Sequence, residues 1–138
     1  MSVRIRNWTA LAGLGAAALV AAMAVPGFAQ STGLSMLGGL TKGEWTIRFR
    51  DGSTPRKICV RGGTELIQLR HREPNCSRFV VEDGASEVTA QYTCPGNGYG
   101  RTSVRKETAT LAQIESQGIA DGLPFQFSAE ARRTGTCG

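Results

Sequence analysis

Strict alternation of apolar and polar residues marks two stretches of this chain. In Glu44–Arg50 every second residue is apolar, which is typical of a β-strand with one buried face. Pro124–Arg132 alternates in the same way and places its phenylalanines and alanines on one side. We therefore expect an early strand and a last strand at these positions.

The stretch between Cys76 and Cys94 predicts a β-hairpin. Residues 76–82 and 87–94 are rich in β-branched residues, and Asp83-Gly84 between them is a strong turn signal because Gly tolerates a positive φ. If the two strands pair across this turn, the two cysteines face each other at a separation that a disulfide can span. The pattern therefore predicts a Cys76–Cys94 disulfide.

Turn signals divide the rest of the chain into short elements. The further elements that we expect are a turn over 51–55, a strand over 56–61, a helix over 64–72, strands over 99–106 and 108–115, and turns at 95–98, 117–118 and 121–122. Six or seven short strands with one short helix predict an all-β fold. Its curved antiparallel sheet would form a barrel or half-barrel stapled by disulfides.

The N-terminus has the pattern of a secretory signal peptide. Arg4 and Arg6 precede an uncharged run over 10–25, and small residues lead up to Ala29. An uncleaved membrane anchor is the alternative, but the run is shorter than the roughly 20 apolar residues that span a bilayer. We expect a signal peptide over 1–29, a flexible lead-in over 30–42 and a β domain over 43–138, in a periplasmic or secreted protein.

Export changes the charge and the role of the cysteines. The whole chain has 16 basic and 11 acidic residues; loss of the two N-terminal arginines would leave 14 against 11, a net charge of +3. Four cysteines in an oxidising compartment predict two disulfides. With Cys76 and Cys94 paired, elimination leaves Cys59 with Cys137. The alternative pairs Cys59 with Cys76 and Cys94 with Cys137.

The cysteine spacing argues against metal or redox chemistry. No two cysteines are close enough for a zinc knuckle or a Cys-x-x-Cys motif, so we expect no metal and no cofactor. The single histidine, His71, lies between two arginines, and we interpret it as a solvated residue at a helix end. The acidic residues around the central turn, Glu82, Asp83 and Glu87, are more typical of a soluble turn than of a catalytic pair.

Two groups of side chains are candidates for binding. A basic patch, expected to attract anionic envelope components or to protect a sheet edge, would flank the first turn and comprise Arg48, Arg50, Arg56 and Lys57. An aromatic set on the apolar faces of the first and last strands comprises Trp45, Phe49, Phe125 and Phe127. These rings would form either the densest part of the core or the wall of a pocket for an apolar ligand.

The first strand, the cysteines and the C-terminus together resemble a family of bacterial envelope proteins. Gly43-Glu44-Trp45 and Arg133-Thr134-Gly135-Thr136-Cys137 are similar to the opening and closing segments of the family known as domain of unknown function 3617. The resemblance covers roughly residues 42–137, although Thr46 stands where the family usually has Glu. It implies an exported β-rich domain and no established activity.

Three classes of function remain open from the sequence. The expected one is a non-catalytic module that binds an apolar or amphiphilic small molecule. A structural or interaction protein of the envelope, acting through its surface, is the second. An enzyme would need a cleft with converging polar groups, which the sequence does not indicate, and nucleic acid is not an expected partner outside the cytoplasm.

Overall fold

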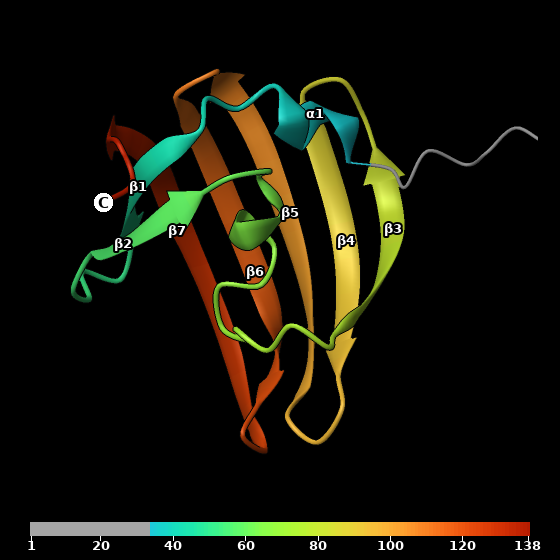
Figure 1. Cartoon of the computed structure of the whole chain (residues 1–138). Helices are drawn as coiled ribbons and strands as arrows, with labels where there is room; N and C mark the ends of the chain where they lie inside the picture. Colours follow the sequence, from blue (N-terminus) through green and yellow to red (C-terminus); the bar gives the residue numbers. More distant parts are fainter. Residues whose placement is uncertain (1–33) are drawn as a thin grey trace, which may run out of the picture.

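Seven antiparallel strands form one curved sheet in the computed structural model, which describes residues 34–138 (Figure 1). The strand order is β2-β1-β7-β6-β5-β4-β3. The strands are β1 Gly43–Phe49, β2 Arg56–Val60, β3 Ser77–Asp83, β4 Glu87–Cys94, β5 Gly98–Thr108, β6 Leu111–Ala120 and β7 Leu123–Gly135. The expected all-β fold is confirmed, and the sheet remains open, as a half-barrel.

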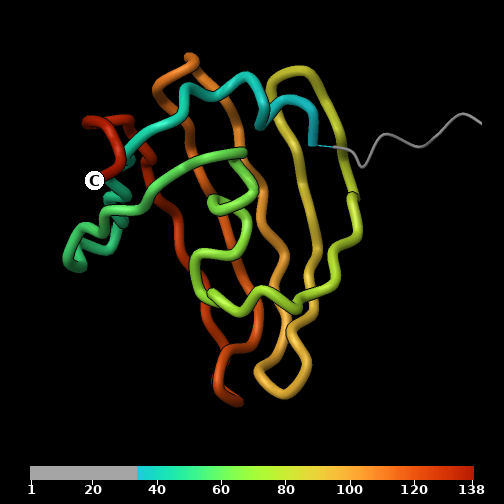
Figure 2. Tube along the Cα trace, in the orientation of Figure 1, coloured from blue at the N-terminus to red at the C-terminus, as the bar shows by residue number. Residues whose placement is uncertain are grey.

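The segment between β2 and β3 covers the inner face of this half-barrel. These two strands are consecutive in the chain but form opposite edges of the sheet, so residues 61–76, here called the crossover, must return across it. Figures 1 and 2 show the crossover passing in front of the central strands. The core therefore lies between the sheet and the crossover.

Buried residues come from the sheet, the crossover and the N-terminal segment. Trp45 and Ile47 of β1 are fully buried, as are Leu66 and Ile67 of the crossover. The hydroxyl of Thr102, on β5, donates a 2.7 Å hydrogen bond to the Ile67 carbonyl and so attaches the crossover to the sheet. This bond satisfies a carbonyl that would otherwise be buried without a partner.

Two disulfides fix the edges of the sheet. Cys76 and Cys94 pair with a Cα–Cα distance of 4.2 Å, and Cys59 and Cys137 pair at 5.5 Å. Both predicted pairs are confirmed, and the alternative pairing is wrong. The β3–β4 register, in which Ser77 faces Thr93, places Cys76 opposite Cys94 as the hairpin argument requires.

The structure corrects the expected helix over 64–72. Only Thr64–Leu66 forms a helical turn, the 3₁₀ turn η1, and the rest of the segment is irregular. The apolar residues of this segment are buried against the sheet without helical periodicity. Its carbonyls bond to side chains of other elements instead, including those of Thr102 and Arg56.

Two glycines act differently from the sequence prediction. The expected turn at 117–118 is wrong, because β6 continues through Gly118 to Ala120. A Cβ at Gly118 would lie 2.1 Å from the Tyr99 carbonyl oxygen, so glycine permits a close approach of two strands here. The central hairpin turn is confirmed, but Gly84 does not adopt a positive φ there. A side chain is excluded for another reason, because a Cβ added at Gly84 would lie 2.9 Å from the Glu87 carbonyl oxygen.

The sequence predicts that the folded domain starts at Gly43, but in the structure it begins earlier in the chain. The short helix α1, Ser35–Gly38, buries Met36 and Leu37, and Leu34 and Leu40 are buried beside it. This part of the expected lead-in thus contributes to the core. The expected signal peptide and its cleavage position lie outside the described residues.

A search of residues 34–138 for a helix long and apolar enough to cross a membrane finds none.

Candidate functional site

Three of the four predicted aromatic residues come together at one end of the inner face. The antiparallel pairing of β1 with β7 brings the Phe49 ring to 5.3 Å from the Phe127 ring, edge to face. The Phe125 ring stacks at 6.2 Å from that of Phe127. All three side chains are half-buried, so their rings are partly accessible to a ligand.

Trp45 does not join this cluster. Its side chain is fully buried in the core, and its indole N–H donates a 2.9 Å hydrogen bond to the Thr41 carbonyl. Alternation along β1 places Trp45 and Phe49 on the same face, but four residues separate them along the strand. Trp45 therefore has a structural position, and only the three phenylalanines form an accessible surface.

The three phenylalanines line an open cleft of about 360 Å³. This volume lies at the lower end of the range that is typical of small-molecule sites. The polar members of the wall include Arg56 and Arg70, together with Asp51, Ser53, Thr54 and Gln126. The cleft thus combines an apolar surface with cationic groups at its border.

Both arginines of the cleft lie over aromatic rings. The guanidinium carbon of Arg56 is 5.7 Å from the Phe49 ring centre, and that of Arg70 is 5.6 Å from the Phe125 ring centre. Each contact has the geometry of a cation–π interaction. These contacts hold the two positive charges next to the apolar wall.

Arg56 points inward from the edge strand β2. In the β1–β2 register it pairs with the buried Ile47, and its Nη2 donates a 2.6 Å hydrogen bond to the Leu69 carbonyl. Its Nε is buried and has no hydrogen-bond partner within residues 34–138. Burial lowers the pKa of Arg56, and the nearby charges of Arg72 and Arg70 lower it further.

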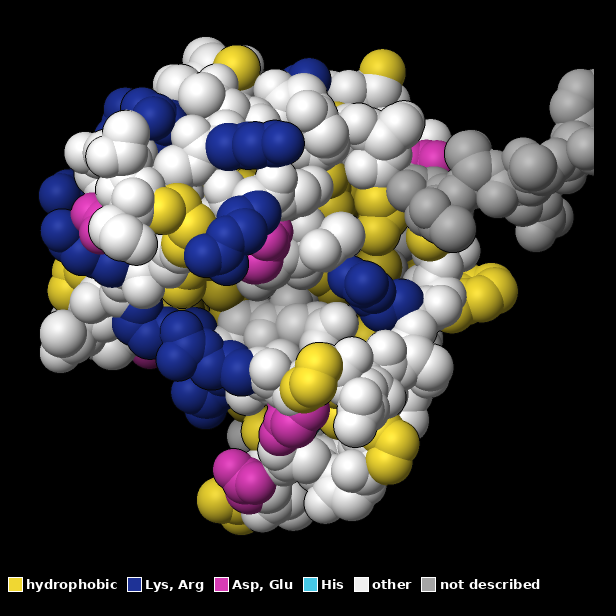
Figure 3. All heavy atoms as spheres, viewed as in Figure 1, with side chains coloured by type: hydrophobic (Ala, Val, Ile, Leu, Met, Phe, Trp, Pro, Cys, Tyr) yellow, Lys and Arg dark blue, Asp and Glu magenta, His cyan; other side chains and the backbone are white. Residues whose placement is uncertain are grey.

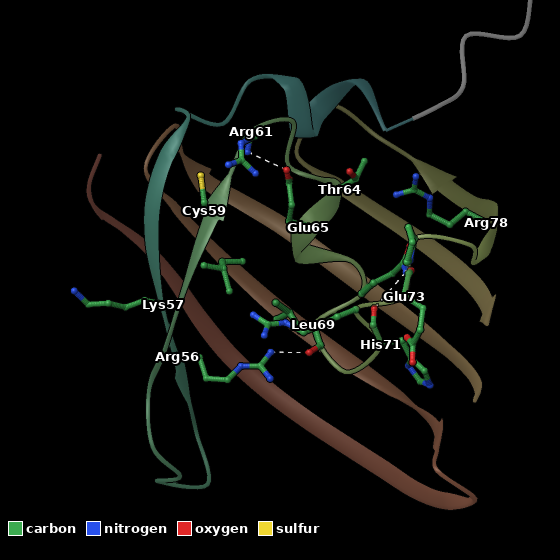
Figure 4. A pocket seen from close by; sticks show the side chains of 14 residues that line it. Arg56, Lys57, Cys59, Arg61, Thr64, Glu65, Leu69, His71, Glu73 and Arg78 are labelled. Carbon is green, nitrogen blue, oxygen red and sulfur yellow. Dashed lines mark hydrogen bonds between the residues drawn. The ribbon is translucent and has the colours of Figure 1, made fainter. Parts of the chain in front are cut away.

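Arg56 also lines a second and larger cavity, of about 490 Å³, here called the basic groove. The groove follows the crossover from β2 towards β3, and Figure 4 shows Arg56 directed at Leu69 while Lys57 points away. Its charged lining residues are Arg56, Lys57, Arg61, Arg72, Arg78, Glu65 and Glu73. In the space-filling view, Lys and Arg side chains gather beside the hollowed region next to the crossover (Figure 3).

His71 fixes the part of the crossover that carries Arg70 and Arg72. Its Nδ1 lies 3.0 Å from the Tyr92 hydroxyl, and its Nε2 lies 3.0 Å from the Asn97 carbonyl. Because a carbonyl only accepts, Nε2 donates, and in the neutral imidazole Nδ1 accepts from Tyr92. The expected solvated histidine is wrong: His71 is fully buried, while its neighbours Arg70 and Arg72 are exposed.

The predicted basic patch is divided between two faces. Arg56 points inward, whereas Lys57 forms a 2.9 Å ion pair with Glu44 and Arg50 donates a 2.6 Å hydrogen bond to Gln113. Alternation along β1 and β2 is the reason, since adjacent strand residues face opposite sides. The expected set of four cations therefore does not form one surface.

The remaining acidic and cysteine clusters have structural positions. Asp83 accepts a 2.9 Å hydrogen bond from the backbone N–H of Leu34, which joins the hairpin tip to the N-terminal segment. Glu73, Cys76 and Cys94 are close enough together to suggest a metal site, but the two sulfurs are bonded to each other. A disulfide offers no thiolate to a metal ion.

In comparisons with protein-family models, curated proteins and solved structures, nothing matches this chain. The resemblance to domain of unknown function 3617 stays a prediction. The geometry of the site is therefore the basis on which a function can be proposed.

Proposed function

We propose that this protein is a non-catalytic binding module for an amphiphilic small molecule. The apolar part of the ligand lies against Phe49, Phe125 and Phe127. The observation that carries this proposal is a wall of three half-buried phenyl rings, with two guanidinium groups over them, on an open cleft of about 360 Å³. Apolar and cationic groups side by side match a ligand with an apolar and a polar end.

The composition of the wall favours binding over a purely structural role. Phe49 and Phe127 pack against the core without being enclosed by it, and Phe125 stacks on Phe127. Core residues such as Trp45 and Ile47 are fully buried. Leaving apolar surface open to water forgoes the free energy of its burial, about 25 cal/mol for each Å². A ligand that covers the rings would recover this free energy.

The position of the only histidine supports a non-catalytic function. Histidine is the residue type most often used as a general base near neutral pH, and His71 is the only one in the sequence. Here both of its ring nitrogens lie within hydrogen-bonding distance of protein groups, and its side chain has no exposed surface. His71 is among the residues around the basic groove, but neither ring nitrogen is free to accept a proton from a substrate bound there.

Two disulfides are typical of an oxidising compartment outside the cytoplasm. We extend this to a periplasmic or secreted protein that acts after cleavage behind Ala29. N-terminal sequencing of the exported protein would then begin at Gln30. A full-length chain recovered in the inner-membrane fraction would contradict this part of the proposal.

A neutral apolar fluorophore such as phenylnaphthylamine tests the cleft. We expect its fluorescence to rise on binding the native protein and to fall strongly with Phe127→Ala. As a matched control, Phe79→Ala removes a ring that is 71% exposed on β3, and binding should persist. If Phe127→Ala unfolds the domain, Phe125→Ala replaces it. Absence of binding by the native protein would contradict the proposal.

One observation favours a second candidate, a surface interaction. The edge strand β3 exposes Phe79 and Val81, whose side chains are 71% and 40% exposed. Exposed apolar residues on an unpaired strand edge are suited to pairing with another chain. Loss of an envelope partner on Phe79→Ala, with probe binding intact, would favour this candidate.

A further inference from the structure

Three arginines that form no ion pair within residues 34–138 lie beside the aromatic cleft. Arg56 comes from β2, and Arg70 and Arg72 come from the crossover on either side of the buried His71. Arg56 lines both the cleft and the basic groove, Arg70 lines the cleft, and Arg72 lines the groove. Arg56 is therefore common to the two cavities, with Arg70 beside it in the cleft and Arg72 beside it in the basic groove.

Arg70 and Arg72 place their positive charges near that of Arg56. Burial lowers the pKa of Arg56 most, and the positive charges of Arg72 and Arg70 lower it further because they disfavour its charged form. The ion pairs within residues 34–138 involve Lys57, Arg105 and Arg132, and none involves these three arginines. Part of the donor capacity of Arg56 is also unused, because its buried Nε has no partner in that range.

The neighbouring carboxylates accept hydrogen bonds from other groups, although the buried Oε2 of Glu73 has no partner within residues 34–138. Glu65 accepts from the backbone N–H groups of Arg61 and Gly62, and Glu73 accepts from the side-chain amide of Asn97. Asp51, on the rim of the cleft, accepts a 2.9 Å hydrogen bond from the backbone N–H of Ser53. None of the three forms an ion pair with the arginines within residues 34–138, so the guanidinium groups remain available to an anionic ligand.

We infer that the polar end of the ligand is a phosphate group, held by Arg56, Arg70 and Arg72 while its apolar chain lies on the phenylalanines. This inference rests on the proposed function and specifies its ligand class. Guanidinium groups bind phosphate through paired N–H···O bonds. The three positive charges of the arginines match the charge of a phosphate group better than the single negative charge of a carboxylate. The ligand class is thus a single-chain phosphorylated amphiphile.

Two ligands that differ only in the phosphate test the inference. They are monolauroylglycerol and lauroyl lysophosphatidic acid, both titrated below their micelle concentrations by calorimetry, with inorganic phosphate as a third ligand. We expect the phosphorylated ligand to bind at least about tenfold more tightly than the neutral one. That advantage should shrink as salt is added, because salt screens exposed charges.

Arg70→Gln and Arg72→Gln are suitable variants because both side chains are exposed, and thermal unfolding of each verifies its fold. Each should reduce affinity for the phosphorylated ligand about tenfold. Arg72→Gln, whose side chain does not line the cleft, should also leave affinity for the neutral ligand unchanged. Arg48→Gln, an exposed arginine of β1 that lines neither cavity, is the matched control and should change neither.

The outcomes separate the two proposals. Equal binding of both amphiphiles, unaffected by the arginine variants, would overturn the phosphate inference and leave the proposed function standing. If inorganic phosphate binds as tightly as the phosphorylated amphiphile, the site binds anions alone. That result would overturn the inference that the apolar chain of the ligand contributes to binding. Binding of none of the three ligands would overturn both proposals.

Discussion

His71 and Tyr92 share a buried hydrogen bond of 3.0 Å between the imidazole Nδ1 and the phenol hydroxyl. The rings also pack edge to face, with centres 5.2 Å apart. Tyr92 fits on β4 because Gly100 of β5 has no side chain, and a Cβ there would lie within 2.4 Å of the hydroxyl. This pair joins the crossover to the sheet and so determines where Arg70 and Arg72 lie.

Replacing His71 should destabilise the domain. His71→Ala leaves the Tyr92 hydroxyl and the Asn97 carbonyl without their partner and opens a cavity, so we expect a loss of about 3 kcal/mol in the free energy of unfolding. The neighbouring exposed residue gives the control: Arg72→Gln should change it by less than about 0.5 kcal/mol. Urea unfolding measures both, and similar losses in the two variants would contradict the role of His71.

Tyr92 predicts a loss of stability at high pH. Burial, with a smaller contribution from the negative charge of Glu73, raises the pKa of Tyr92 to about 12. An unfolded tyrosine titrates near pH 10, so above about pH 10 the unfolded chain releases a proton that the folded chain retains. The stabilisation is present below pH 10 and is lost as the pH rises towards 12.

This dependence can be isolated with Tyr92→Phe. The difference in unfolding free energy between the native protein and this variant should be constant below pH 10 and should shrink above it. A difference that stays constant up to pH 12 would show that Tyr92 ionises equally readily in both states.

The two disulfides should contribute unequally to stability. Cys59–Cys137 spans 78 residues of sequence and Cys76–Cys94 spans 18. In the chain-entropy description, removing the longer link by Cys→Ala at both positions costs about 4.5 kcal/mol, and removing the shorter one costs about 3 kcal/mol. Denaturant unfolding of the two double variants shows which disulfide contributes more to the free energy of unfolding. The reverse order would show that effects in the folded state outweigh loop closure.

Much of the fold follows from local sequence signals. Alternation identifies β1 and β7, and two strands with a turn between them identify the hairpin that brings Cys76 to Cys94. The predicted helix over 64–72 failed because closely spaced apolar residues fit a helix and a buried irregular segment equally well. Gly118 was misread because sequence alone does not distinguish a turn glycine from one that permits two strands to approach.

The site was predictable only in part. Alternation placed Phe49, Phe125 and Phe127 on one face, but it could not show that Trp45 lies deeper in the core. His71 and its flanking arginines were missed because the helix prediction obscured their pattern. In an extended segment, Arg70-His71-Arg72 is the signature of one buried residue between two exposed ones. The convergence of Arg56 with the crossover depends on long-range packing, which no local signal contains.

The most direct test of the account is to locate a bound amphiphile on the protein. Backbone amide NMR shifts, recorded while lauroyl lysophosphatidic acid is added below its micelle concentration, report which residues sense the ligand. The account predicts perturbations concentrated at Phe49, Phe125 and Phe127 and at Arg56 and residues 69–72. Saturation without shifts there, or shifts confined to the edge strand around Phe79, would contradict it.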